Sequence, residues 1–273
     1  KTGVLSDVRL PGFIRSYWLP YSNKVVSEFQ DPAGISYRSF DYQTKATTTI
    51  GSDITAFAVS PDGRQVAYMK PIEDASALFI SDSDGSAPRT LMTTRVREVR
   101  LDWPVKNTLS MASRRPDRAG TDLSAIGLDG TLTVMMSNRE NLEYAWSPDG
   151  SRLLYSYFTP EEGVSLWYRE TGSGLDIPLG LATSARKCAW HDNTMTITCG
   201  VPAKNSLGRD VPADRSATVD DIVTLNLTTG EQNRQYGGTS ATLIGVIEPL
   251  VSSSGNYFVF TNLFDQRLYL FPL

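Results

Sequence analysis

The chain has 273 residues, of which 40% are hydrophobic and 21% are charged, and its formal net charge is −4. This ordinary mixture excludes a collagen, a long coiled coil and a wholly disordered chain, each of which requires a strongly biased composition. The small acidic excess argues against a dedicated nucleic-acid-binding protein, and no apolar run reaches the roughly 18 residues that span a bilayer.

The sequence lacks the residues of several common catalytic sites. His191 is the only histidine, which excludes a metal site built from several imidazoles. There is no Gly-x-Ser-x-Gly nucleophile turn, no phosphate-binding Gly-x-x-x-x-Gly-Lys-Ser/Thr loop and no Gly-x-Gly-x-x-Gly motif. We therefore expect no cofactor, no metal and no catalytic residues, although missing motifs do not exclude an enzyme.

Two segments of the chain are close copies of each other. Phe57-Ala-Val-Ser-Pro-Asp-Gly-Arg-Gln-Val-Ala-Tyr68 and Tyr144-Ala-Trp-Ser-Pro-Asp-Gly-Ser-Arg-Leu-Leu-Tyr155 lie 87 positions apart, which is two periods of about 43 residues. Degenerate copies at this period begin near Trp18, Leu101, Ala189 and Leu250. The sequence therefore predicts six repeats, which cover roughly 13–50, 54–92, 96–136, 141–180, 185–237 and 243–273.

Each repeat is predicted to form four short strands. An apolar stretch leads into Ser-Pro-Asp-Gly, where proline presets φ for a turn and glycine accepts positive φ at its exit. An alternating stretch rich in strand-forming residues follows, such as Val66-Ala-Tyr68. Second turns are expected at Gln43-Thr44-Lys45, Asp84-Gly85, Asp129-Gly130, Thr171-Gly172 and Thr229-Gly230. Four strands in 40 to 45 residues are typical of a propeller blade.

The Ser-Pro-Asp-Gly hairpin with its tyrosine, followed by a Leu-Phe/Trp strand and an Asp-Gly turn, resembles the repeat of TolB-type β-propellers. The resemblance runs from about Trp18 to Leu273 and is clearest in the second and fourth repeats. It implies an all-β, six-bladed propeller with protein partners in the bacterial cell envelope. Such blades also occur in enzymes and in accessory domains of peptidases, so the motif specifies the blade better than the function.

The two ends of the chain are expected to close the ring. The last repeat stops after its third strand, at Arg267-Leu-Tyr-Leu-Phe-Pro-Leu273, and residues 2–10 precede the first innermost strand. We expect residues 2–10 to supply the missing outer strand, because an unpaired sheet edge would otherwise remain. Residues 1–273 would then form one propeller domain, since every blade needs its neighbours to bury its faces.

Cys188 and Cys199 flank the first hairpin of the fifth repeat, centred on Asn193-Thr194. In that position they can face each other across antiparallel strands. A disulfide between them would indicate an oxidising, extracytoplasmic location. The alternative is a pair of buried free thiols, and a metal site with His191 would lack a fourth ligand.

Two connections between second and third strands are longer than the rest. They are the basic loop Ser113–Gly120 and the insertion Val201–Val219. Loops of this type emerge on one face of a propeller, and long insertions in compact folds are usually functional or disordered. The alternative is a solvated loop with no partner. The candidate residues of a protein-binding surface are Arg114, Arg115, Arg118, Lys204, Arg209, Asp210 and Arg215.

Two patterns that suggest ligand sites have simpler explanations. Asp82-Ser-Asp84-Gly85 resembles the start of a calcium loop but lacks the further carboxylate downstream, so a hairpin turn is the better interpretation. Trp103, Trp146 and Trp190 recur at one position per repeat, which favours packing between adjacent blades over a ligand cage.

The favoured interpretation is a non-catalytic, extracytoplasmic protein-binding or scaffold propeller of the bacterial envelope, monomeric and without a nucleic-acid partner. One alternative is an enzyme of lactonase or cyclase type with a metal or carboxylate site in the central channel, and another is an accessory propeller domain of a peptidase. The innermost strands are expected to carry charges of both signs, a mixture more typical of ion pairs than of cation ligands. These residues are Arg97, Glu98, Arg100, Glu140, Glu143, Arg186 and Lys187.

Overall fold

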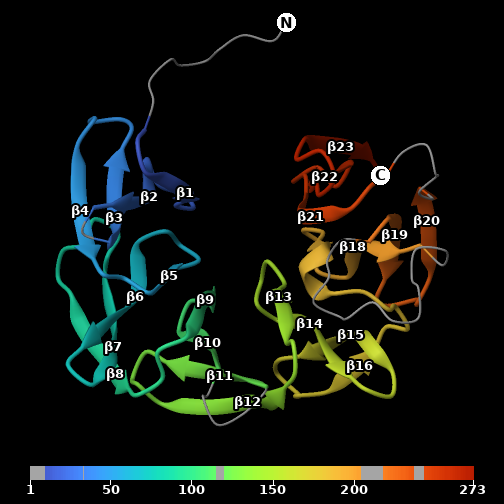
Figure 1. Cartoon of the computed structure of the whole chain (residues 1–273), viewed down its shortest axis with the longest axis horizontal. Helices are drawn as coiled ribbons and strands as arrows, with labels where there is room; N and C mark the ends of the chain where they lie inside the picture. The colour runs from blue at the N-terminus through green and yellow to red at the C-terminus, as the bar shows by residue number, and fades with distance from the viewer. Residues whose placement is uncertain (1–9, 33, 115–119, 204–217, 237–242) are drawn as a thin grey trace, which may run out of the picture. The chain divides into compact units, whose positions relative to one another are not determined.

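The computed structural model describes residues 10–32, 34–114, 120–203, 218–236 and 243–273. Apart from one short 3-10 helix, the regular structure of these residues consists of antiparallel strands arranged in six sheets (Figure 1). The all-β prediction is confirmed, and each sheet falls on one predicted repeat. No helix in the described ranges has the length and apolar character to cross a membrane.

The chain divides into two compact units, Lys1–Pro116 with Asp122–Met136, and Asp117–Thr121 with Ser137–Leu273. In the first unit, consecutive strands pair with one another to form sheets in chain order. The first two sheets are β1 (Phe13–Trp18), β2 (Lys24–Asp31), β3 (Gly34–Asp41) and β4 (Thr47–Ser52), and β5 (Ala56–Val59), β6 (Gln65–Ile72), β7 (Ala75–Asp82) and β8 (Arg89–Thr94). The third sheet is β9 (Val99–Val105), β10 (Thr108–Arg114), β11 (Thr121–Gly127) and β12 (Leu132–Arg139), whose last residues belong to the second unit.

The second unit continues the same order of strands. Its first two sheets are β13 (Glu143–Trp146), β14 (Arg152–Thr159), β15 (Gly163–Glu170) and β16 (Asp176–Pro178), and, after the 3-10 helix η1 (Ala185–Lys187), β17 (Cys188–Trp190), β18 (Thr196–Pro202), β19 (Asp220–Asn226) and β20 (Gln232–Tyr236). The sixth sheet contains three described strands, β21 (Val246–Val251), β22 (Tyr257–Asn262) and β23 (Leu268–Pro272).

The predicted Ser-Pro-Asp-Gly turns join the first two strands of their sheets. In the turn between β5 and β6, the Gly63 amide donates to the Ser60 carbonyl at 2.9 Å, and Gly63 has φ of +67°. The turn between β13 and β14 repeats this geometry, with Gly150 also at φ +67°. Glycine tolerates this left-handed conformation because it has no Cβ. The turn prediction is therefore confirmed at both positions.

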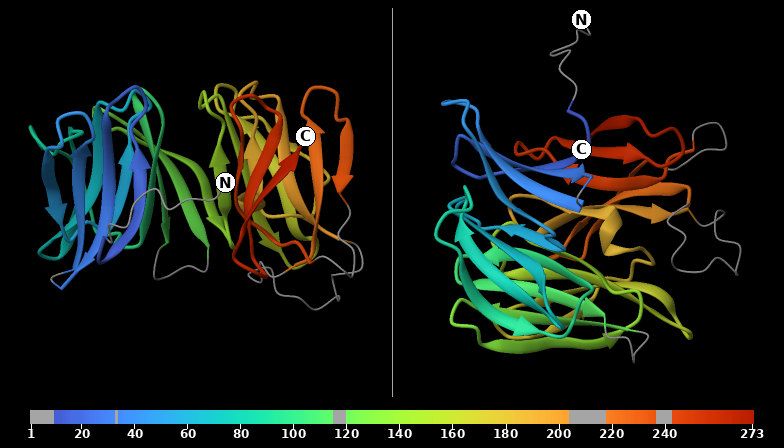
Figure 2. Two further views of the ribbon diagram at one scale, coloured as in Figure 1. Left: turned by 90° about the horizontal axis from the view of Figure 1, so that it is seen from above. Right: turned by 60° about the vertical axis from the view of Figure 1, so that its left-hand side comes forward.

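The hydrophobic core lies between successive sheets of each unit, which face one another (Figure 2). One cluster joins Leu78 of the second sheet to Leu109 of the third, and another joins Leu154 of the fourth to Ile197 of the fifth. Trp103 and Trp190 are buried in these two clusters, so the expected packing role of the repeated tryptophans is confirmed for both. Adjacent sheets thus bury each other's faces, as the repeat predicts.

The sixth sheet keeps an open edge within the described part of the chain. β23 pairs with β22 on one side and with no other described strand. Two of its apolar side chains are exposed, Leu268 at 74% and Leu270 at 64%. The strand expected to cover this edge consists of residues 2–10, of which only Leu10 is described, so ring closure and the single domain stay predictions.

Candidate functional site

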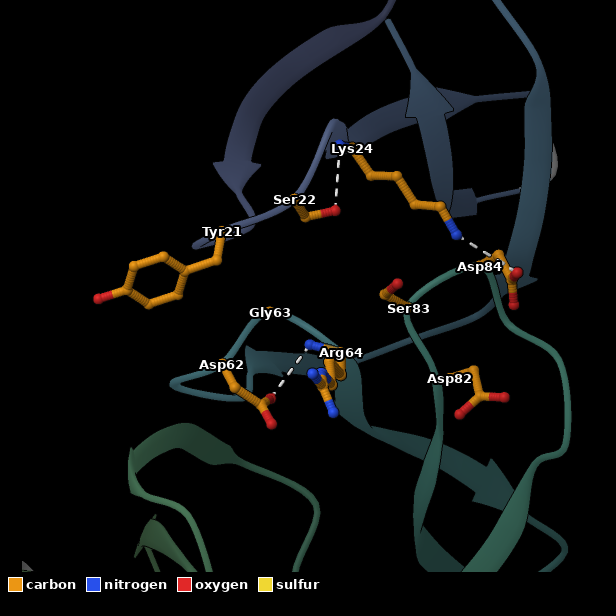
Figure 3. Close-up of a pocket in the computed structure, with 9 residues that line it drawn as sticks. All are labelled: Tyr21, Ser22, Lys24, Asp62, Gly63, Arg64, Asp82, Ser83 and Asp84. Carbon is orange, nitrogen blue, oxygen red and sulfur yellow. Dashed lines mark hydrogen bonds and ion pairs between the residues drawn. The ribbon is translucent and has the colours of Figure 1, made fainter. Parts of the chain in front are cut away.

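Three hairpin turns of the first unit enclose a hollow of about 510 Å³. One turn joins β1 to β2, the second joins β5 to β6, and the third follows β7. Figure 3 shows Arg64 and Ser83 in the middle of this hollow, with Tyr21 at its edge. The lining residues are Tyr21, Ser22, Lys24, Asp62, Gly63, Arg64, Asp82, Ser83 and Asp84.

Close backbone approach holds the first two turns together. A Cβ atom added at Gly63 would overlap the Pro20 carbonyl oxygen, so glycine is required there by space as well as by its positive φ. The third turn is tied to the second by the Ser83 amide, which donates to the Arg64 carbonyl at 2.9 Å. Backbone contacts rather than side chains therefore position the walls of the hollow.

Two carboxylates of the hollow are occupied by hydrogen bonds from their own turns. Asp62 accepts from the Ser60 hydroxyl at 2.8 Å and from the Arg64 amide at 3.1 Å, and these bonds hold its pKa below the usual range. Asp84 accepts from the Ser86 hydroxyl at 2.6 Å and amide at 3.0 Å, which likewise lower its pKa. Both side chains are therefore turn formers, as the sequence indicates.

The remaining charges differ in how far they are paired. The Lys24 ammonium lies 3.4 Å from an Asp84 oxygen, a long contact between partly exposed groups. Asp82 is exposed and accepts one hydrogen bond, from the Ser86 hydroxyl at 3.3 Å. The exposed guanidinium of Arg64 forms no hydrogen bond or ion pair within the described ranges. Arg64 lines the hollow, and its guanidinium carries five N–H donors.

Ser83 carries a second open group. Ser83 is 7% exposed, and its hydroxyl has no hydrogen-bond partner among the described residues. Ser83 lines the hollow and its oxygen is not fully enclosed, so the hydroxyl is available to a ligand there.

Tyr21 lies at the edge of the hollow. It is 99% exposed and adopts φ of +54°, a left-handed conformation that costs a bulky residue of the order of 1–3 kcal/mol. Trp18, at the end of β1, is 73% exposed on the same hairpin. An aromatic side chain held in solvent at an energetic cost is a feature that folding alone does not explain.

Of the seven predicted partner-binding residues, the one in the described ranges does not line this hollow. Arg114 is the one that the structure describes: it is exposed and ends β10, where the second strand of its sheet leads to the third. The hollow instead lies at the opposite end of its sheets, with the turns between first and second and between third and fourth strands. The other six lie outside the described residues: Arg115, Arg118, Lys204, Arg209, Asp210 and Arg215.

Cys188 and Cys199 are joined in a disulfide. They are directly opposite in the pairing of β17 with β18, and both are buried. His191, in the adjoining turn, shares a hydrogen bond of 2.9 Å between its Nε2 and the Thr198 hydroxyl. No group of three or more His, Cys, Asp or Glu side chains suited to a metal occurs among the described residues.

Five of the seven charged residues expected on innermost strands lie elsewhere. Arg97 and Glu98 precede β9, and Glu140 lies in the turn before β13. Arg186 and Lys187 belong to the 3-10 helix η1, because the Ser184 side chain accepts the Arg186 amide and starts a turn before β17. Arg186 pairs with Glu143 at 2.6 Å, whereas Lys187 is buried and its ammonium lies 2.8 Å from Asp220. The expected ion pairing therefore holds for these two residues, although their predicted place on a strand is wrong.

Sequence reasoning missed the hollow, although the repeat contained a signal for it. In the alignment of repeats, Tyr21 stands where the second and fourth repeats have the turn-forming Asp62 and Asp149. A departure from the repeat at a turn position marks a residue that the blade itself does not require. No comparable signal distinguished Ser83, because serine is an ordinary turn residue.

The sequence matches no protein-family model and no curated protein. The fold is similar to that of several solved structures. TolB from Acinetobacter baumannii is 13% identical with a TM-score of 0.58, over 92% of this chain and 61% of that one. The β-propeller domain of the Trilobed protease from Pyrococcus furiosus, described as having an open velcro topology, is 13% identical with a TM-score of 0.61, over 96% and 82%. An oligogalacturonate lyase in complex with manganese is 14% identical with a TM-score of 0.55, over 96% and 90%.

These similarities establish a β-propeller fold of the TolB-like type. The six sheets are consistent with six blades. The chain spans less than two thirds of the TolB structure, and the similar structures include enzymes as well as TolB. Fold alone therefore does not select a function.

Proposed function

We propose that the chain is a non-catalytic binding propeller of the bacterial cell envelope, and that it engages a protein partner through the hollow of its first unit. The observation that carries the proposal is Tyr21, 99% exposed in a left-handed backbone conformation at the edge of the hollow that Arg64 also lines. Tyrosine, tryptophan and arginine are the residues that most often dominate the energy of protein interfaces. The backbone contact between Pro20 and Gly63 keeps these side chains on a preorganised surface, which lowers the entropic cost of binding.

The extracytoplasmic location is supported by the Cys188–Cys199 disulfide, since such bonds persist in oxidising compartments. The non-catalytic role is supported by the pairing of two carboxylates, one on the innermost strand β13 and one at the start of β19, the third strand of its sheet. Glu143 is bound by Arg186 and Asp220 by Lys187, so neither carboxylate is open for acid–base chemistry or for a cation.

The test is affinity capture from a native envelope extract with the intact chain. We expect Tyr21→Ser to reduce recovery of the captured partner at least about tenfold, the loss typical of an interface hot spot. Tyr257→Ser serves as a matched control, because Tyr257 is an exposed tyrosine of the second unit. Equal recovery by both variants would contradict the hollow as the binding surface. In that case Arg114→Glu would test the opposite end of the sheets.

We also propose that residues 2–10 close the ring by pairing with the open edge of β23. The exposed Leu268 and Leu270 support this, because an unprotected apolar edge strand invites aggregation. A chain without residues 2–9 should melt at a lower temperature and aggregate more readily than the full chain. An unchanged melting temperature would contradict the closure.

A further inference from the structure

The open groups of the hollow are mostly hydrogen-bond donors. Arg64 offers five N–H groups and Ser83 one hydroxyl, neither with a partner in the described chain. Among the acceptors, Asp62 and Asp84 each accept two hydrogen bonds from their own turns, whereas the exposed Asp82 carboxylate accepts one long bond from Ser86. A ligand that completes these bonds must therefore supply acceptor oxygens for Arg64 and Ser83, and it can also place a donor on Asp82.

The charge of the hollow constrains the ligand further. Its lining contains two cationic side chains, Lys24 and Arg64, and three carboxylates, Asp62, Asp82 and Asp84. An anionic ligand would meet three carboxylates at short range, and a cationic one would meet Arg64 beside the buried Ser83. Desolvating an unmatched charge is costly in either case. The lining therefore favours an uncharged ligand.

We infer that the hollow binds the main chain of an uncharged, extended peptide segment of the protein partner, through carbonyl oxygens that accept from Arg64 and Ser83. The peptide group is neutral, and it carries a carbonyl acceptor for Arg64 and Ser83 together with an N–H donor for the open Asp82. The flat ring of Tyr21 offers apolar area for the side chain or peptide plane beside those carbonyls. The inference rests on the proposed function.

The experiment follows backbone amide shifts of the intact, isotope-labelled chain during titration with acetyl-Ala-Ala-Ala-amide. The same peptide with a central lysine or aspartate, and maltotriose, are titrated in parallel. We expect the neutral peptide to bind with Kd of about 1–10 mM and to shift the amides of Ser22, Gly63 and Ser83. Ser83→Ala and Arg64→Met should each raise Kd about three- to tenfold, the effect of one lost hydrogen bond.

Two controls separate binding from folding. Ser83→Ala should leave the melting temperature unchanged, because the hydroxyl has no intramolecular partner to lose. Arg89→Met removes an exposed arginine from the same sheet and should leave Kd unchanged. Loss of binding by Arg89→Met, or a lowered melting temperature that accounts for the loss in Ser83→Ala, would overturn the inference.

Other outcomes also overturn it. These are tighter binding of a charged peptide that disappears at high salt, binding of maltotriose without the neutral peptide, and no binding at about 20 mM of the neutral peptide. The proposed function fails separately, if the intact chain captures no envelope protein that depends on Tyr21. Capture that depends on Tyr21 but not on Ser83 or Arg64 would retain the proposed function and discard the peptide main chain as the ligand of the hollow.

Discussion

The buried ion pair of Lys187 and Asp220 predicts a large loss of stability when its charge balance is broken. Asp220 is fully buried and Lys187 is 5% exposed. The ammonium donates to both Asp220 oxygens, at 2.9 and 2.8 Å, and to the Thr218 hydroxyl at 2.6 Å, and the Val246 amide donates to Asp220 at 2.8 Å. Removing one member of such a pair leaves a buried charge uncompensated, which costs about 3–5 kcal/mol.

Asp220→Asn should therefore lower the free energy of unfolding by about 3–5 kcal/mol, because asparagine keeps an acceptor for Val246 but not the charge. Asp220→Ala also leaves that amide unpaired and adds about 1–3 kcal/mol, so its total approaches the whole stability of a typical domain. In urea unfolding followed by tryptophan fluorescence, a slope of about 2–3 kcal/mol per M places the midpoint of Asp220→Asn about 1–2.5 M lower.

Two comparisons decide whether the buried charge is the cause. Lys187→Met with Asp220→Asn should be more stable than Asp220→Asn alone, since the double variant leaves no unpaired charge. Glu143→Gln breaks the more exposed pair with Arg186 and should cost less than about 1 kcal/mol. The reasoning is refuted if the double variant is no more stable than Asp220→Asn, or if the two single carboxylate changes have equal effects.

Three further predictions follow from local geometry. The unfolded, non-reduced protein should contain no maleimide-reactive thiol, because Cys188 and Cys199 are bonded; labelling of both would contradict the oxidised state. Gly63→Ala should lower the free energy of unfolding by about 2 kcal/mol or more, since its Cβ overlaps the neighbouring turn and its φ is positive, whereas Gly172→Ala has free space around it and should not. Burial lowers the pKa of His191, so its neutral form is favoured in the folded state. Its contribution to stability is complete above pH of about 6.5 and should be lost progressively as the pH falls below that value. His191→Gln should reduce the change in melting temperature on acidification, and an identical change would contradict the assignment.

The sequence predicts the blades of this protein better than its site, for a physical reason. A turn such as Ser60 to Gly63 is specified locally, by proline and glycine conformations and a side chain that caps its own turn, so it can be read without knowing its neighbours. The placement of Lys187 could not be predicted, because its partner Asp220 lies 33 positions further along the chain and the local sequence does not show that the two residues meet. Whether the Ser83 hydroxyl finds a hydrogen-bond partner depends on how distant segments pack around it, and the local sequence does not encode this packing.

The position of Tyr21 connects repeat chemistry with function. In the second and fourth repeats, the carboxylate of the aspartate at this position accepts hydrogen bonds from its own turn. Asp62, for example, accepts from the Ser60 hydroxyl and the Arg64 amide. A tyrosine cannot accept those bonds in the same way, and the first turn instead adopts positive φ and directs the ring into solvent. Replacing the aspartate therefore removes a local stabilising interaction and adds backbone strain. A change that costs stability on both counts is retained more readily when the side chain contributes to binding. The hollow next to Tyr21, rather than the Ser-Pro-Asp-Gly turn of the fourth repeat, is therefore the surface to test first.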